Sequence, residues 1–114
     1  MEKIEALIHP FASDQVCEEL VALHVKQIIA TEVREVDEKR NGSRVYSHTD
    51  WNEHGSWDRS QVWYDTIQMA KIKLELIVPE SMVNRVVATI IRAGKTSKGV
   101  DIKVFISVVE RVIG

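Results

Sequence analysis

Hydrophobic and polar positions follow regular spacings along most of this chain, and each spacing predicts an element. Residues 2–9 hold a short apolar run closed by Pro10, which is typical of a buried strand because proline cannot donate to a ladder. From Ser13 the apolar positions repeat at helical spacing, with acids in the early turns where the helix dipole favours them. Residues 26–37 are rich in β-branched side chains and predict a second strand.

The second half of the chain shows clearer repeats. Residues 71–78 alternate between apolar and charged side chains, which predicts a strand with one buried face. After Pro79 the apolar positions return to helical spacing and continue as far as Gly94, a residue type common at helix ends. Residues 102–109 predict a last strand that is apolar on both faces. One of those faces can pack on helices, and the apolar side chains of the other must be buried by another part of the protein or by a second copy.

The order of these elements predicts the fold class. Strand, helix, strand, long gap, strand, helix and strand make an α+β fold, the ferredoxin-like βαββαβ arrangement. Its four-stranded antiparallel sheet carries two helices on one face and leaves the other face bare, so we expect self-association. At 114 residues the chain suits a single domain, 1–114, with an insertion at about residues 38–70.

The insertion is unusual because a connection of this length inside a compact domain is normally functional. It holds all three tryptophans and both tyrosines of the chain. Large aromatic side chains outside the core periodicity suit a loop that docks on a partner protein. Packing of these aromatics onto their own domain is an equally favoured alternative. The docking candidates are Tyr46, Trp51, Trp57 and Trp63.

Composition and charge exclude several classes of function. Lys and Arg number 15 against 17 Asp and Glu, a net charge of -2, so no basic field favours nucleic acid. Cys17 is the only cysteine, which fits a reducing compartment. We find no signal stretch and no window near the roughly 20 apolar residues of a membrane span. We therefore expect a cytoplasmic protein that meets a membrane only through a partner.

Four short motifs lie in or beside the predicted strands. They are KIEALIHPF at residues 3–11, TEV at 31–33, KLELIVP at 73–79 and KVFI at 103–106. Together they resemble the motifs of the PII nitrogen-regulatory proteins and their PII-like relatives, over nearly the whole chain outside the insertion. The resemblance implies a homotrimer with adenine-nucleotide clefts between subunits. It also implies a protruding T-loop that docks on a transporter or a metabolic enzyme.

The resemblance further implies where a ligand would bind. Three residues would lie near the adenine, and three lie in or next to the phosphate loop: Leu7, Glu75 and Ile77, then Lys98, Asp101 and Lys103. ATP, ADP and AMP are therefore the candidate ligands. Effector binding in the cleft would change what the long loop can dock on, which is signal transduction by population shift.

Two motifs depart from the family pattern. Residues 35–39 read EVDEK where the family has GFGRQ, so the glutamine that helps to hold magnesium and 2-oxoglutarate is missing. Two acids stand where glycines would let a dianion approach, and we expect no standard 2-oxoglutarate binding. Residues 96–103 keep one glycine of the phosphate loop, which weakens an anion nest. A triphosphate is therefore less favoured than ADP or AMP.

Two rival interpretations stay open. A CutA-like trimer would share the fold and use His48 and His54 for divalent cations, although these two histidines form no recognised closed site and no metal site is predicted. Alternatively, the chain is a ligand-binding module that has lost the nucleotide, which the missing glycines favour. No nucleophile, base and acid stand at catalytic spacing, so we expect no enzyme activity.

Overall fold

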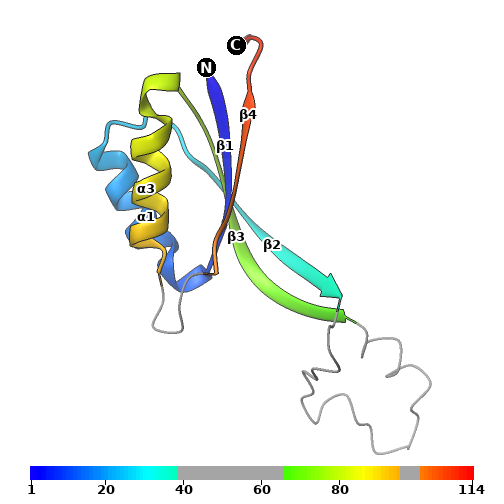
Figure 1. Ribbon diagram of the computed structural model, residues 1–114. Helices are drawn as coiled ribbons and strands as arrows, with labels where there is room; N and C mark the ends of the chain where they lie inside the picture. The colour runs from blue at the N-terminus through cyan, green and yellow to red at the C-terminus, as the bar shows by residue number, and fades with distance from the viewer. Residues whose placement is uncertain (39–65, 96–100) are drawn as a thin grey trace, which may run out of the picture. The chain divides into compact units, whose positions relative to one another are not determined.

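The computed structural model describes residues 1–38, 66–95 and 101–114 of the chain. The described strands form a four-stranded antiparallel sheet in the order β2–β3–β1–β4, and the two described α-helices lie side by side on one face (Figure 1). This confirms the ferredoxin-like fold. The elements are β1 (Glu2–Ile8), η1 (Pro10–Ala12), α1 (Ser13–Ala22), β2 (Ile29–Glu38), β3 (Thr66–Val78), η3 (Glu80–Met82), α3 (Val83–Ala93) and β4 (Lys103–Val108).

The chain divides into two compact units. The first comprises Met1–Val33 and Ala70–Gly114, and the second comprises Arg34–Met69. In the second unit, Arg34 of β2 donates a hydrogen bond from Nη1 to the side-chain oxygen of Gln68 on β3, at 3.0 Å. The hydrophobic core and both described α-helices, α1 and α3, belong to the first unit.

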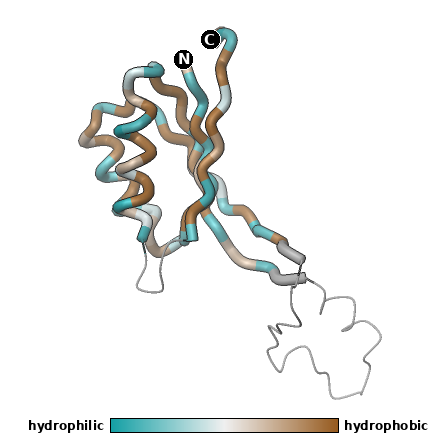
Figure 2. The backbone as a smooth tube through the Cα atoms, viewed as in Figure 1, coloured by the Kyte–Doolittle hydropathy of each residue, from teal (hydrophilic) through white to brown (hydrophobic). Residues whose placement is uncertain are grey.

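Alternation along the strands creates the core. On β1, Ile4, Ala6 and Ile8 are fully buried toward the helices, and on β3 Leu74 and Leu76 face the same core. Figure 2 shows the pattern as hydrophobic and hydrophilic bands that alternate along these strands. The residues between them point to the opposite face of the sheet, which carries no helix in the described part of the chain.

Each α-helix buries one apolar stripe against the sheet. Val16 and Leu20 of α1 are fully buried, as are Val86 and Ile90 of α3. Members of each pair are four residues apart, so they lie on one face of their helix. Among the described residues, no helix has both the length and the apolar character needed to cross a membrane.

Gly94 ends α3 at the position that the sequence pattern predicted. Its main-chain N–H donates to the carbonyl of Ile90 at 2.8 Å. A β-carbon at this position would lie 2.8 Å from that carbonyl oxygen and 2.8 Å from Cδ1 of Ile102. Glycine is therefore favoured here chiefly by the close approach of the Ile90 carbonyl oxygen, which belongs to the backbone of α3.

β3 is longer than the alternating pattern predicted. It begins at Thr66, five residues before the expected start at residue 71, and so includes part of the expected insertion. Its neighbour β2 continues to Glu38. Neighbouring strands supply each other with hydrogen-bond partners, so pairing carries both strands beyond the region of strict alternation.

β4 forms one edge of the sheet and exposes apolar side chains on both of its faces. Phe105 is 55% exposed, Ile106 51% and Val108 79%. Hydrophobic colour covers most of this strand in Figure 2. In the part of the chain that the structure describes, no strand pairs with its outer edge. Such an edge is a natural template for association.

Candidate functional site

Four of the candidate ligand residues share the face of the sheet opposite the helices. The strand register places Leu7 of β1 opposite Lys73 on one side and Lys103 on the other. Glu75 and Ile77 follow Lys73 at steps of two residues, so their side chains leave β3 on the same face. The structure therefore makes Leu7 and Lys103 direct neighbours, with Glu75 and Ile77 farther along the face.

Glu75 belongs to four alternating charges on this face, which we call the charge quartet: Lys3, Glu5, Lys73 and Glu75. The ammonium of Lys3 lies 3.1 Å from Glu75 and 3.9 Å from Glu5. The ammonium of Lys73 lies 3.1 Å from Glu5 and 3.7 Å from Glu75. The hydrogen bond from Lys3, followed by the charges of Lys73 and Lys3, lowers the pKa of Glu75. Glu75 is therefore an ionised hydrogen-bond acceptor at neutral pH.

Asp101 is the ionic partner of a buried lysine that the sequence pattern did not reveal. Lys71 of β3 is only 1% exposed, and its ammonium contacts the carboxylate of Asp101 and, at 3.4 Å, the Asp101 main-chain carbonyl. The hydrogen bond from Lys71 lowers the pKa of Asp101. Alternation along β3 assigned Lys71 to a solvated face. Its ammonium contacts Asp101, 30 positions later in the sequence, and a local sequence pattern cannot predict such a contact.

The remaining candidates lie outside the described residues, and their roles stay predictions. They are Lys98 of the phosphate loop, the docking residues Tyr46, Trp51, Trp57 and Trp63, and the weak metal candidates His48 and His54. Within the described ranges, no three side chains of the metal-ligating types gather.

A cleft of about 790 Å³ is lined by residues near one end of the sheet. The two chain termini lie at this end, as Figure 1 shows. Its walls come from four segments: β1, the α1–β2 connection with the start of β2, the end of β3 with η3, and the segment after β4. Among the candidates, the cleft includes Glu75 and Ile77. No motif spans these four segments, so the sequence did not predict the cleft. The lining residues are Lys3, His24, Val25, Lys26, Gln27, Ile29, Glu75, Leu76, Ile77, Val78, Pro79, Met82, Val109, Arg111 and Val112.

Comparison with known proteins identifies the family. The sequence model described as "Nitrogen regulatory protein P-II" matches residues 1–114, the whole chain. The chain belongs to the P-II family. Similar P-II proteins include "Nitrogen regulatory protein P-II" of Haemophilus influenzae, which is 32% identical over 113 residues, 99% of this chain and 89% of that protein. "Nitrogen regulatory protein P-II 1" of Escherichia coli K12 has the same identity and coverage.

A further relative, "Nitrogen regulatory protein P-II" of Cereibacter sphaeroides, is 33% identical over 113 residues, again 99% of this chain and 89% of that protein. Membership of the P-II family confirms the resemblance of the strand motifs. It places this chain among signal-transduction regulators. The shared face of the sheet, its charge quartet and the terminal cleft are the candidate ligand-recognition features of this P-II chain.

Proposed function

We propose that this P-II chain is a homotrimeric sensor that binds an adenine nucleotide in clefts between its subunits. Nucleotide binding changes what the segment at about residues 38–70 can dock on, and so regulates a transporter or a metabolic enzyme. The proposal treats 1–114 as one domain with that segment inserted. It places the protein in the cytoplasm and requires no catalysis.

The observation that carries the proposal is the common face of Leu7, Glu75, Ile77 and Lys103. Apolar side chains can pack on a base, an ionised carboxylate accepts hydrogen bonds from hydroxyl or amino groups, and an ammonium pairs with phosphate. Leu7 and Lys103 are direct cross-strand partners, with backbones roughly 5 Å apart. Apolar contact and positive charge are therefore within the span of one small ligand.

Self-association is supported by the exposed edge strand. Phe105 and Val108 of β4 expose apolar side chains, and a second copy is a natural cover for them. We expect sedimentation to show a trimer that Phe105→Glu weakens. Val21→Glu is the matched control, since Val21 is 60% exposed on α1, on the helix side of the sheet. A stable wild-type monomer at micromolar concentration would contradict the proposal.

Nucleotide binding is tested by thermal shift and calorimetry with ATP, ADP and AMP. We expect nucleotide to raise Tm, because a ligand that binds only the folded state stabilises it. Lys103→Ala should abolish most of this rise, whereas Lys95→Ala, which removes an exposed cation after the end of α3, should keep it. No response to any nucleotide contradicts the proposal and favours a module that has lost nucleotide binding.

Two further titrations distinguish this proposal from a standard 2-oxoglutarate sensor and from a metal-binding protein. We expect no tight, ATP-dependent binding of 2-oxoglutarate, because Glu35 and Asp37 stand where the family pattern has glycines. Zinc or copper should not raise Tm. A metal-induced rise that the double variant His48→Ala with His54→Ala removes would favour the CutA-like interpretation.

A further inference from the structure

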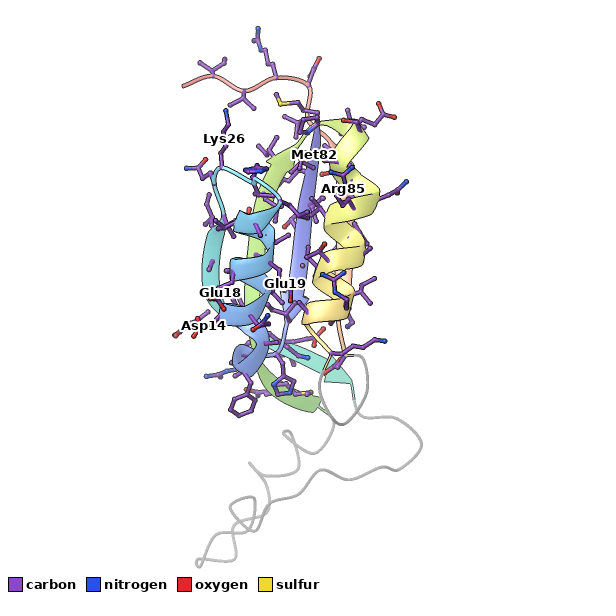
Figure 3. The ribbon with its side chains drawn as sticks, turned by 90° about the vertical axis from the view of Figure 1, so that its left-hand side faces the viewer. Asp14, Glu18, Glu19, Lys26, Met82 and Arg85 are labelled. Carbon is purple, nitrogen blue, oxygen red and sulfur yellow. The ribbon has the colours of Figure 1, made fainter. Side chains whose placement is uncertain are left out.

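Lys71 of β3 is a charged side chain in the interior of the fold. It is 1% exposed, whereas Asp14 and Glu18 of α1 and Arg85 of α3 are exposed on the helix side, as Figure 3 shows. An ammonium without water needs an acid beside it, because an unpaired buried charge is strongly unfavourable. An apolar side chain would fill the same space without that cost, so a buried ion pair is better explained by the geometry that it fixes.

Lys71 holds its partner Asp101 at two points. Its ammonium contacts the carboxylate of Asp101 and also lies 3.4 Å from the main-chain carbonyl oxygen of the same residue. A contact to the carboxylate alone would leave the backbone room to rotate, whereas the two contacts together restrain both parts of the residue. The side chain of Asp101 is 51% exposed, so the contact fixes a surface segment to a buried anchor. We call this pair the Lys71–Asp101 clamp.

The clamp lies at the entrance of β4. Asp101 precedes Lys103, the first residue of β4, by two positions. The pairing of Lys103 with Leu7 is also the last one in the register of β1 and β4. The end of a strand frays easily, because the ladder holds it from one side only. The clamp holds the chain on the other side of Lys103, so this residue lies between two attachments.

Lys71 and Lys103 share one face of the sheet. Lys71 precedes Lys73 by two residues on β3, and the register places Leu7 between Lys73 and Lys103. Side chains two residues apart leave a strand on the same side, so Lys71 belongs to the face that carries the proposed phosphate contact. The clamp therefore acts beside Lys103 and not across the hydrophobic core.

The clamp also counters the charge of Asp101. The hydrogen bond from Lys71, followed by the charges of Lys71, His9 and Lys103, lowers the pKa of this carboxyl group. Asp101 is therefore ionised at neutral pH and close enough to Lys103 for their charges to interact. A carboxylate at this place would repel phosphate oxygens if no cation balanced it. The ammonium of Lys71 supplies that balance.

We infer that Lys71 is a positioning residue for phosphate recognition by Lys103. It fixes the chain that enters β4, and it neutralises the carboxylate that lies near Lys103. The inference rests on the proposed function and deepens it, because it gives a second lysine a part in recognising the phosphate end of the ligand. Lys71 acts through Asp101 and not by touching the ligand.

Calorimetric titration with AMP, ADP and ATP measures both effects, because the three ligands differ in phosphate charge. Lys71→Met leaves Asp101 uncompensated, so the loss of affinity should increase with charge, from about threefold for AMP to about thirtyfold for ATP. Lys71→Met combined with Asp101→Asn removes the carboxylate as well and should cost about threefold for each ligand. Lys95→Met, the matched change at an exposed lysine, should leave the three affinities unchanged.

Equal losses for AMP and ATP in Lys71→Met would indicate a structural effect alone and overturn the inference, as would wild-type affinities in both variants. Circular dichroism and sedimentation establish that each variant keeps the wild-type fold and assembly. Should Lys71→Met unfold, Asp101→Asn replaces it. That change leaves the ammonium of Lys71 uncompensated, so the loss should be smaller for ATP than for AMP. A loss that does not depend on ligand charge again overturns the inference.

Hydrogen–deuterium exchange separates this inference from the proposed function. Without nucleotide, the peptide covering residues 101–104 should exchange about threefold faster in Asp101→Asn than in wild type, because the chain before Lys103 is released. Unchanged exchange overturns the inference. Absence of nucleotide binding in the wild type contradicts the proposed function instead, and exchange then decides whether the clamp holds the entrance of β4.

Discussion

Glu5 and Glu75 are direct cross-strand partners on β1 and β3, an arrangement that would be repulsive by itself. Lys3 and Lys73 each lie within 4 Å of both acids, so that positive and negative charges alternate around the quartet. All four side chains are between 25% and 35% exposed, so solvent and salt screen the interactions. The two lysines therefore offset the repulsion between Glu5 and Glu75 on this partly solvated face.

Removal of one quartet lysine should lower stability in a salt-dependent way. Lys73→Met leaves Glu5 and Glu75 facing each other with Lys3 as their quartet partner. We expect a lower Tm at low ionic strength and a smaller decrease at high salt, where charge repulsion is screened. Thermal denaturation in a salt series measures this, with Lys95→Met as the control. Equal Tm values for the variant and wild type at low salt would disprove it.

Glu75 should contribute to the acid sensitivity of the fold. Its pKa in the folded chain lies below the ordinary value of 4.5, chiefly through the hydrogen bond from Lys3. The resulting stabilisation is complete above 4.5 and is lost as pH falls through the lowered pKa. Urea denaturation at a series of pH values should show a shallower acid loss for Glu75→Gln. Parallel curves for the two proteins would reject this role.

The pair of Lys71 and Asp101 should matter more than an exposed ion pair. Asp101→Asn leaves a buried ammonium without its carboxylate, and we expect a loss of about 1–2 kcal/mol after allowing for the exposure of Asp101. The double variant with Lys71→Met should recover part of this loss. Arg92→Ala breaks an exposed pair with Glu19 and serves as the control. Comparable losses from both single variants in urea denaturation would contradict the expectation.

Gly94 should tolerate no side chain. Gly94→Ala places a β-carbon 2.8 Å from the carbonyl oxygen of Ile90 and 2.8 Å from Cδ1 of Ile102. The backbone oxygen cannot move without distorting α3, so we expect a destabilisation of about 1–3 kcal/mol. Chemical denaturation measures it against Lys95→Ala at the next position. A variant as stable as wild type would show that the end of α3 can shift.

His24 should show opposite effects on stability and on ligand binding. Glycine suits the left-handed backbone at this position, so His24→Gly should raise stability by roughly 0.5–1 kcal/mol. The same change removes the imidazole from the cleft and should weaken binding of the fluorescent dye anilinonaphthalene sulfonate. Denaturation and fluorescence titration measure the two effects. A destabilised variant would contradict the expected gain in stability. Unchanged dye affinity would contradict a role of the imidazole in binding.

Local patterns were sufficient for elements whose stability depends on one buried face. The apolar spacing of Val16 and Leu20 predicted α1, and that of Val86 and Ile90 predicted α3, because a stripe at helical spacing has one way to become buried. The start of β3 at Thr66 was not predicted, because pairing with β2 extends the strand. A single-strand pattern contains no information about its partner.

The candidate site was predictable only where a motif marks it. The resemblance of the strand motifs suggested Leu7, Glu75 and Lys103 as candidates, and the strand register of the structure places them on one face. The terminal cleft was missed because Lys26 and Arg111 come from segments far apart in the sequence. Neither residue is unusual in its own segment, and only the folded chain brings both to one cavity.

The charge quartet is electroneutral, because two ammonium groups and two carboxylates cancel within a single subunit. A neighbouring copy that covers the quartet meets no net charge from these four side chains, so the fit at this point can depend on shape and apolar contact. We therefore expect the quartet to add little ionic-strength dependence to self-association, although it places four charged side chains on this face.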